Sequence, residues 1–85
     1  MSIKLVYFAW VRERVGKSDE LFEPPADVRT IGELIAHLAQ RDEAYAYAFE
    51  RAPFIRAAID RKHAKHDTPI LGAHEIAFFP PMTGG

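Results

Sequence analysis

A segment near the middle of the chain carries the clearest helix signal in the sequence, and that signal limits the folds open to it. Thr30 and Glu33 have the spacing of a capping box, in which a hydroxyl and a carboxylate accept hydrogen bonds from free N–H groups at a helix start. The apolar residues that follow recur at intervals of three and four, as one helical face requires: Ile31, Leu34, Ile35 and Leu38. This pattern predicts one main helix over residues 30–41, buried along one side.

Five segments around this helix have the composition of β-strands, with many β-branched and aromatic residues. The expected strands span residues 3–8, 19–23, 54–59, 63–66 and 75–79. One main helix across a mixed sheet is an α+β arrangement, and the order of elements is that of the β-grasp, or ubiquitin-like, fold. A chain of 85 residues has room for one domain, which we place at residues 1–79, followed by a flexible tail over residues 80–85.

Two short helices are expected beside the main one. Gly16 fits the left-handed position that ends a helix over residues 9–15. Residues 42–50 are ambiguous, because their aromatic residues alternate as in a strand while the alanines between them favour a helix. We favour a short helix capped by Asp42.

The composition excludes several classes of site and partner. The chain has no cysteine, so it cannot form a disulfide, a zinc–thiolate site or a cysteine nucleophile, and a reducing compartment is expected. The formal net charge is −1 and no basic stripe is present, so we expect neither nucleic acid nor a membrane as a partner. No apolar run approaches the roughly 20 residues of a membrane span, and the start lacks a signal-peptide pattern. We therefore expect a cytoplasmic protein.

No motif in the sequence predicts a metal or nucleotide site on this chain. His63 and His66 are three residues apart in an expected strand, which sends their side chains to opposite faces. The glycine-rich phosphate loop and the nucleophile elbow have no match. The scattered carboxylates are expected to be helix caps or solvated surface groups: Asp42, Glu43, Asp60 and Glu75.

The alternation of side chains along the first and last expected strands places two phenylalanines on polar faces. Phe8 shares a face with Lys4, and Phe79 shares a face with Glu75. If the two strands are neighbours, Phe8 and Phe79 form an exposed apolar patch of the kind that binds a partner protein. The alternative is that a helix or a loop covers both rings.

The last six residues have the composition of a slender extension: Pro80, Pro81, Met82, Thr83, Gly84 and Gly85. The prolines favour an extended polyproline conformation that stiffens the exit from the sheet, and the glycines carry no Cβ. Six residues reach roughly 20 Å at about 3.3 Å per residue. Two interpretations stay open at this point, namely a tail that enters a partner's active site and reacts at its carboxylate, or an unstructured terminus.

The sequence as a whole resembles the MoaD family, the small subunits of molybdopterin synthase, which are related to the ThiS sulfur carriers. The resemblance is strongest over residues 75–85, which match the family's acidic–aliphatic–Ala-Phe-Phe-Pro-Pro-x-Thr/Ser-Gly-Gly ending almost residue for residue. Residues 6–16 and 30–38 also resemble the family's N-terminal motif and helix start.

The resemblance implies a sulfur carrier that works with three partner proteins and binds no cofactor itself. An E1-like adenylyltransferase would use ATP and magnesium to adenylate the Gly85 carboxylate, and a sulfurtransferase would supply the sulfur that replaces AMP. The tail from Pro80 to Gly84 would enter the large synthase subunit. There the Gly85 thiocarboxylate would give its sulfur to cyclic pyranopterin monophosphate, forming molybdopterin within a heterotetramer.

The resemblance also assigns partner-binding positions, with two departures from the family pattern. Phe8, Phe79 and His63 fall at positions that face partner proteins in the family, although position 63 is often aliphatic in relatives. Asp60 stands where relatives often have asparagine. The alternatives are a sulfur carrier for thiazole or tRNA thiolation, a ubiquitin-like modifier of other proteins, and a purely structural β-grasp module.

Overall fold

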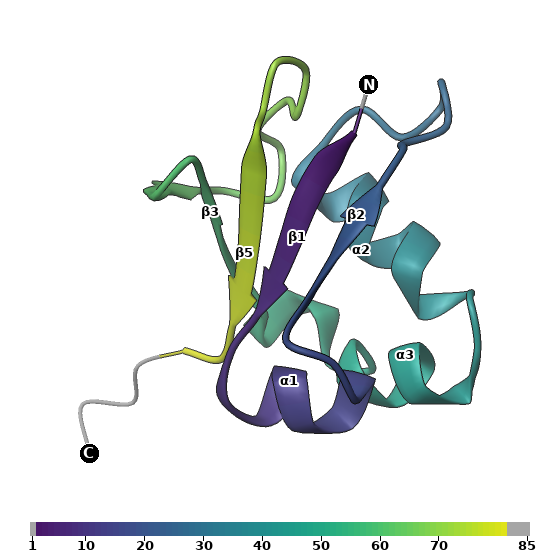
Figure 1. The fold of residues 1–85 in the computed structure, drawn as a ribbon. Coiled ribbons are helices and arrows are strands. Elements are labelled where there is room, and N and C mark those ends of the chain that lie inside the picture. Colours follow the sequence, from purple (N-terminus) through teal and green to yellow (C-terminus); the bar gives the residue numbers. More distant parts are fainter. Residues whose placement is uncertain (1, 82–85) are drawn as a thin grey trace.

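A mixed β-sheet forms one layer of the molecule in the computed structural model, which describes residues 2–81. Within those residues five strands are present: β1 (Ile3–Tyr7), β2 (Asp19–Phe22), β3 (Arg56–Ile59), β4 (Lys62–Ala64) and β5 (Glu75–Phe79). Their order across the sheet is β2-β1-β5-β3-β4. The central strands β1 and β5 run parallel, while the other pairs are antiparallel (Figure 1). The two strands that precede the expected patch and tail are therefore direct neighbours.

Helices cover one face and one end of this sheet (Figure 1). They are α1 (Ala9–Val15), α2 (Ile31–Ala39), α3 (Glu43–Ala48) and a short 3₁₀ helix, η1 (Ala52–Phe54). The apolar face of α2 that the sequence predicts is fully buried, and α1 lies at the end of the sheet where β1 and β5 finish. The predicted α+β arrangement of one main helix, short extra helices and a mixed sheet is confirmed.

The predicted helix boundaries rest on local side-chain signals that the structure confirms. The Thr30 hydroxyl accepts a hydrogen bond from the Glu33 backbone N–H at 3.2 Å, and the Glu33 carboxylate accepts one from the Thr30 N–H at 3.1 Å. The Asp42 carboxylate caps α3 through the Tyr45 N–H at 3.1 Å, so the helix reading of this segment is correct. Gly16 adopts φ 90° at the end of α1, a conformation that glycine favours.

The largest differences from the predicted strand boundaries lie in β3 and β4, while β1 and β2 each end one residue earlier than predicted. Residues 52–54 form η1 with Pro53 in its first turn, so β3 begins at Arg56 and not at residue 54. The turn between β3 and β4 consists of Asp60 and Arg61, which both have positive φ, at 48° and 72°. These angles make a two-residue hairpin turn, and β4 therefore spans Lys62–Ala64 in place of residues 63–66.

The core lies between the sheet and the helices, and aromatic rings from three elements meet in it. The Tyr7 ring is stacked on the Phe78 ring with 6.2 Å between centroids, and Phe49 packs edge-on against Phe78 at 5.4 Å. All three rings are buried. Tyr7 and Phe78 directly precede Phe8 and Phe79, so the core fixes the positions of both residues of the expected patch.

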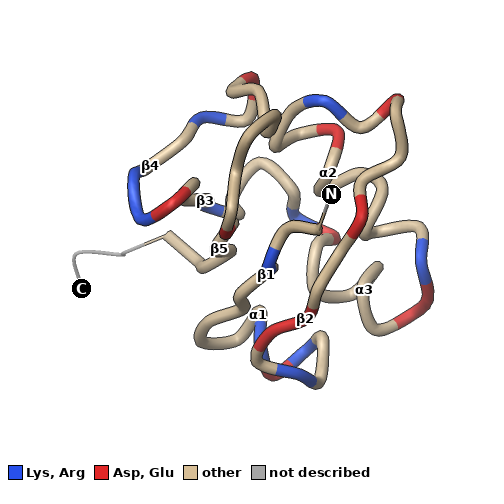
Figure 2. Tube along the Cα trace, turned by 45° about the horizontal axis from the view of Figure 1, so that its top comes forward, with Lys and Arg blue, Asp and Glu red and all other residues tan. Residues whose placement is uncertain are grey.

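The charged residues are spread around the trace, with acidic and basic positions interspersed (Figure 2). None of the helices in the described residues has the length and apolar character needed to cross a bilayer.

Candidate partner-binding surface and tail exit

The expected reactive end of the chain lies only partly within the described residues. Gly85, Gly84, Thr83 and Met82 lie outside them. Pro80 and Pro81 follow β5 directly and are half-buried, so the chain is still in contact with the domain where it leaves the sheet.

Phe8 and Phe79 lie side by side on the face of the sheet that the helices leave uncovered. Tyr7 pairs with Phe78 across the parallel strands β1 and β5, and the Phe8 N–H donates to the Phe78 carbonyl oxygen at 3.0 Å. Phe8 is 46% exposed, so neither a helix nor a loop covers its ring. Phe79 is half-buried. The two rings thus present apolar area to solvent at the base of the tail.

His63 joins the same face from the neighbouring hairpin. It pairs with Ala58 across β3 and β4, and Ala58 pairs with Ala77 of β5. The His63 ring meets the Phe79 ring edge-on, with 5.6 Å between centroids. An imidazole in this position extends the apolar area while adding polar nitrogens. All three partner-binding residues predicted from the resemblance are therefore brought together by the strand order.

Small side chains form the floor of this face, and the sequence prediction did not assign them to the site. Ala58 and Ala77 are 9% and 8% exposed, so they leave a shallow surface from which the larger rings project. The register that brings them together joins strands far apart in the sequence, which no local pattern reveals. We use the term outer sheet surface for Val6, Phe8, Ala58, His63, Ala77 and Phe79 together.

Asp60, the position that departs from the family pattern, ties the β3–β4 turn to the start of β5. One Asp60 carboxylate oxygen accepts from the backbone N–H groups of His74 at 3.0 Å and Glu75 at 2.9 Å. These bonds, chiefly the one from Glu75, lower the pKa of Asp60. An asparagine side-chain oxygen could accept the same two bonds.

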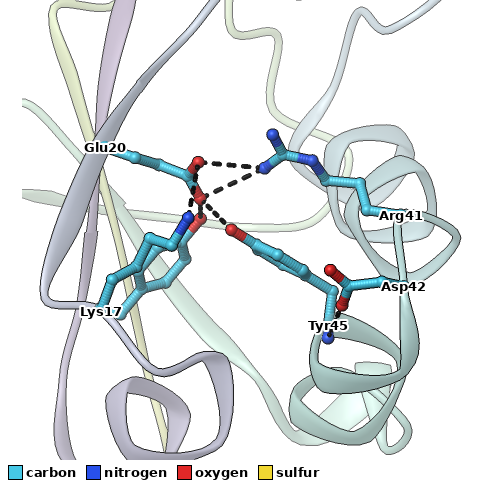
Figure 3. A network of polar contacts seen from close by, with 6 residues as sticks. Lys17, Glu20, Arg41, Asp42 and Tyr45 are labelled. Atoms are coloured by element: carbon cyan, nitrogen blue, oxygen red, sulfur yellow. Dashed lines mark hydrogen bonds and ion pairs between the residues drawn. The ribbon is translucent and has the colours of Figure 1, made fainter.

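A polar cluster inside the fold holds α3 against the sheet (Figure 3). The Glu20 carboxylate on β2 accepts hydrogen bonds from the hydroxyls of Tyr7 and Tyr45, both at 2.6 Å, and from Arg41 at 3.1 Å. The Lys17 ammonium lies 3.7 Å away. Burial alone would raise the pKa of Glu20, but the bonds from Tyr45, Tyr7 and Arg41 outweigh it and lower the pKa. Burial and the Glu20 carboxylate together raise the pKa of Tyr7 and of Tyr45.

The Glu20 cluster lacks the free acceptor atoms of an open catalytic site. Its acceptor oxygens are already occupied by donors from four side chains, which suits a structural role. Sequence reasoning missed it, because the partners of Glu20 are 3 to 25 positions away and come from four elements or loops.

The prediction that one strand sends His63 and His66 to opposite faces does not apply, because β4 ends at Ala64 and His66 lies beyond it. His63 lies on the outer sheet surface, whereas the His66 Nε2 atom is 2.8 Å from the Ile55 carbonyl oxygen. Among residues 2–81 no group of three or more histidine, cysteine or acidic side chains could hold a metal ion.

Comparison with known proteins gives a consistent result over almost the whole chain. The model of the ThiS family matches residues 5–85. The molybdopterin synthase sulfur carrier subunit of Escherichia coli is 39% identical over 98% of this chain and 99% of its own length. The protein of the same name from Haemophilus influenzae is 32% identical with the same coverage.

Solved structures of similar fold include two archaeal proteins. A putative molybdopterin converting factor, subunit 1, from Pyrococcus furiosus has a TM-score of 0.68 at 18% identity, with 96% of this chain and 99% of that chain covered. Small archaeal modifier protein 1 of H. volcanii has a TM-score of 0.70 at 19% identity, with 95% and 98% covered. At such identities the likeness concerns the fold alone, and it confirms the predicted ubiquitin-like β-grasp fold.

Proposed function

The chain belongs to the ThiS family, and from that membership we propose that it works as the sulfur carrier subunit of a molybdopterin synthase. The observation that carries the proposal is the similarity to two sulfur carrier subunits of that enzyme over nearly the full length of each. The Pro-Pro-Met-Thr-Gly-Gly ending and the apolar surface beside its base support the same function. The alternative function, a ubiquitin-like modifier of other proteins, has no comparable support, because the likeness to small archaeal modifier protein 1 concerns the fold alone.

In this proposal residues 1–79 form the carrier domain and residues 80–85 form the reactive tail. A carboxylate is a poor electrophile, so an E1-like adenylyltransferase with ATP and magnesium first converts the Gly85 carboxylate to an acyl-adenylate and releases pyrophosphate. A sulfurtransferase then supplies sulfur at the oxidation level of sulfide, which displaces AMP and leaves a thiocarboxylate on Gly85. The chain needs no cysteine and no bound cofactor for this chemistry, since the sulfur is held by its own backbone carbonyl carbon.

The receiving partner in the proposal is the large synthase subunit. The tail, from Pro80 to Gly84, places the thiocarboxylate in that subunit's active site, where its sulfur passes to cyclic pyranopterin monophosphate and the Gly85 carboxylate is regenerated. Two such transfers, from two thiocarboxylated chains, give the dithiolene of molybdopterin. The sulfur transfer depends on both subunits, because the acids and bases that it requires belong to the partner. We place this activity in the cytoplasm.

The experiment that tests the proposal follows the mass of the intact chain. Incubation with an E1-like adenylyltransferase, ATP, magnesium and a sulfurtransferase should add the mass difference between one sulfur and one oxygen atom. Omission of ATP should leave the mass unchanged. Addition of the large subunit and the pterin substrate should then yield molybdopterin, whereas a carrier for thiazole or tRNA would accept sulfur without completing this step.

We expect the outer sheet surface to contribute directly to binding of the large subunit. Truncation of Phe79 or Phe8 to alanine should raise the Kd about tenfold each, because aromatic residues at the centre of an interface carry much of the binding energy. Phe8→Ala should change the stability little, since its ring is already 46% exposed. Isothermal titration calorimetry and thermal unfolding measure the two quantities.

The matched control is Lys4→Ala, which lies exposed on the same face of β1. A surface lysine is seldom a large contributor to binding. Calorimetric affinities for Phe8→Ala and Phe79→Ala equal to that of the control would show that the partner binds elsewhere.

A further inference from the structure

A groove opens beside the base of the tail, and its lining includes none of the outer sheet surface residues. Five residues from three separate segments line it: Trp10, Arg51, Phe54, Pro80 and Pro81. Its volume is about 400 Å³. Figure 1 shows why these segments meet, since the chain leaves β5 next to the turn that enters α1. Anything bound in the groove would therefore touch the first residues of the tail.

Two features of the lining residues are typical of an interaction site. Phe54 is 56% exposed, and it adds apolar area to a groove that Trp10 and the two prolines also line. Arg51 is exposed, and within residues 2–81 no carboxylate lies within ion-pair distance of its guanidinium. The groove thus combines unburied apolar area with a positive charge that no carboxylate of residues 2–81 neutralises.

Trp10 is held in place from the side by a stack of cationic and aromatic groups. The Arg14 guanidinium lies 4.5 Å from the centroid of the Trp10 ring and 3.9 Å from that of Tyr47. Arg14 also donates to the Tyr47 carbonyl oxygen at 3.2 Å and lies 3.5 Å from Glu50. Because the ring is already fixed, Trp10 loses little side-chain entropy when a ligand packs on it. Arg14 therefore pairs within the domain, whereas Arg51 has no ion-pair partner among residues 2–81.

We propose that this groove is a second docking point for the large subunit, and that it receives an apolar side chain flanked by a carboxylate. The apolar group would pack between Trp10 and Phe54, and the carboxylate would pair with Arg51. Contact with Pro80 and Pro81 at the same time would fix the direction in which the tail leaves the domain. The proposal rests on the function proposed above and adds a site and a ligand chemistry to it.

The test compares groove variants with matched variants at the opposite end of the molecule. Phe54→Ala is paired with Leu71→Ala, whose side chain is 91% exposed, and Arg51→Ala is paired with Arg29→Ala, also exposed. Calorimetry with the intact large subunit should give a Kd about tenfold higher for Phe54→Ala and unchanged for Leu71→Ala. Arg51→Ala should weaken binding at low salt and flatten its salt dependence, while Arg29→Ala should not.

A conservative variant separates docking from simple loss of packing. Trp10→Phe keeps an aromatic ring in the groove and should retain most of the affinity. Steady-state turnover should show a raised KM with a nearly unchanged kcat for Phe54→Ala, since the reacting Gly85 is untouched.

Three other results would contradict the proposal, and each would lead to a different conclusion. Parent-like binding by Phe54→Ala and Arg51→Ala, with Phe79→Ala still weakened, overturns the groove and leaves the sulfur-carrier function standing. Failure of the parent chain to bind the large subunit overturns both. Self-association of the chain in sedimentation experiments that Phe54→Ala removes, with subunit binding unaffected, would assign the groove to a second copy of this chain.

Discussion

Removal of Gly85, or addition of one residue after it, is expected to abolish sulfur transfer while leaving the fold unchanged. In the proposed mechanism the terminal carboxylate is the only group of the chain that reacts. Deletion or extension shifts that carboxylate by about 3.5 Å along an extended tail. A displacement of even 1 Å at a reacting centre can cost about 100-fold in rate, so a shift of this size should reduce the activity below detection.

Two measurements establish the effect of changing Gly85. Thiocarboxylate formation is followed by intact mass spectrometry, and molybdopterin formation is followed with the large subunit and the pterin substrate. The midpoint of thermal unfolding should match that of the parent, because the last core residue of β5 is Phe78 and seven residues separate it from the end of the sequence. A variant with one extra residue at the N-terminus is the matched control and should stay active. Activity in either Gly85 variant would disprove the carrier mechanism.

The sequence predicted those elements of the fold whose signals are local. Thr30 with Glu33, Asp42 and Gly16 each act within one helical turn, and all three behave as their patterns predict. A tight turn at residues 60–62 is also expected from the sequence and is present at Asp60 and Arg61, but its conformation has no local signal, because two successive non-glycine residues with positive φ are uncommon. The start of β3 was predicted two residues early because an apolar, aromatic run fits both a strand and a 3₁₀ turn.

The predictability of the site follows the same division. The alternation along β1 and β5 placed Phe8 and Phe79 on one face without knowledge of the fold, since a period of two needs only the strands to be neighbours. The contact of His63 with Phe79 depends on the strand order β5-β3-β4, which the residues alone do not reveal. The groove between Trp10, Phe54 and the prolines joins three distant segments, and its lining has no common pattern in the sequence.

Replacement of Glu20 by alanine is expected to lower the stability more than replacement of any other carboxylate described in the domain. The substitution leaves the hydroxyl of Tyr7 without its acceptor next to the core, and it removes the shared partner of Tyr45 and Arg41. Loss of hydrogen bonds to a charged, mostly buried group should lower the free energy of unfolding by about 2–4 kcal/mol. The total free energy of unfolding of a native protein is only about 5–15 kcal/mol, so this loss is large.

The same cluster makes the stability depend on pH in a defined direction. The pKa of Glu20 is lower in the folded chain than in the unfolded chain, so the folded state binds this proton less readily. The stabilisation is present in full above the ordinary pKa of a glutamate. It is lost as the pH falls through the lowered pKa of the folded state. The free energy of unfolding of the parent, measured with urea, should therefore fall as the pH is lowered. The fall should be smaller for Glu20→Ala.

The control for Glu20 is Glu13→Ala, an exposed position on α1, which should change the free energy of unfolding by about 0.5 kcal/mol or less. A double-mutant cycle between Glu20→Ala and Tyr45→Phe should give a coupling free energy of about 0.5–3 kcal/mol, because the two side chains share a hydrogen bond. Equal unfolding curves for Glu20→Ala and Glu13→Ala would show that the cluster does not hold α3 to the sheet.

The Glu20 cluster also has a consequence for function, because it anchors Tyr7, whose ring stacks on Phe78. These two residues directly precede Phe8 and Phe79. Glu20→Ala should therefore weaken binding of the large subunit as well, although Glu20 lies on neither the outer sheet surface nor the groove.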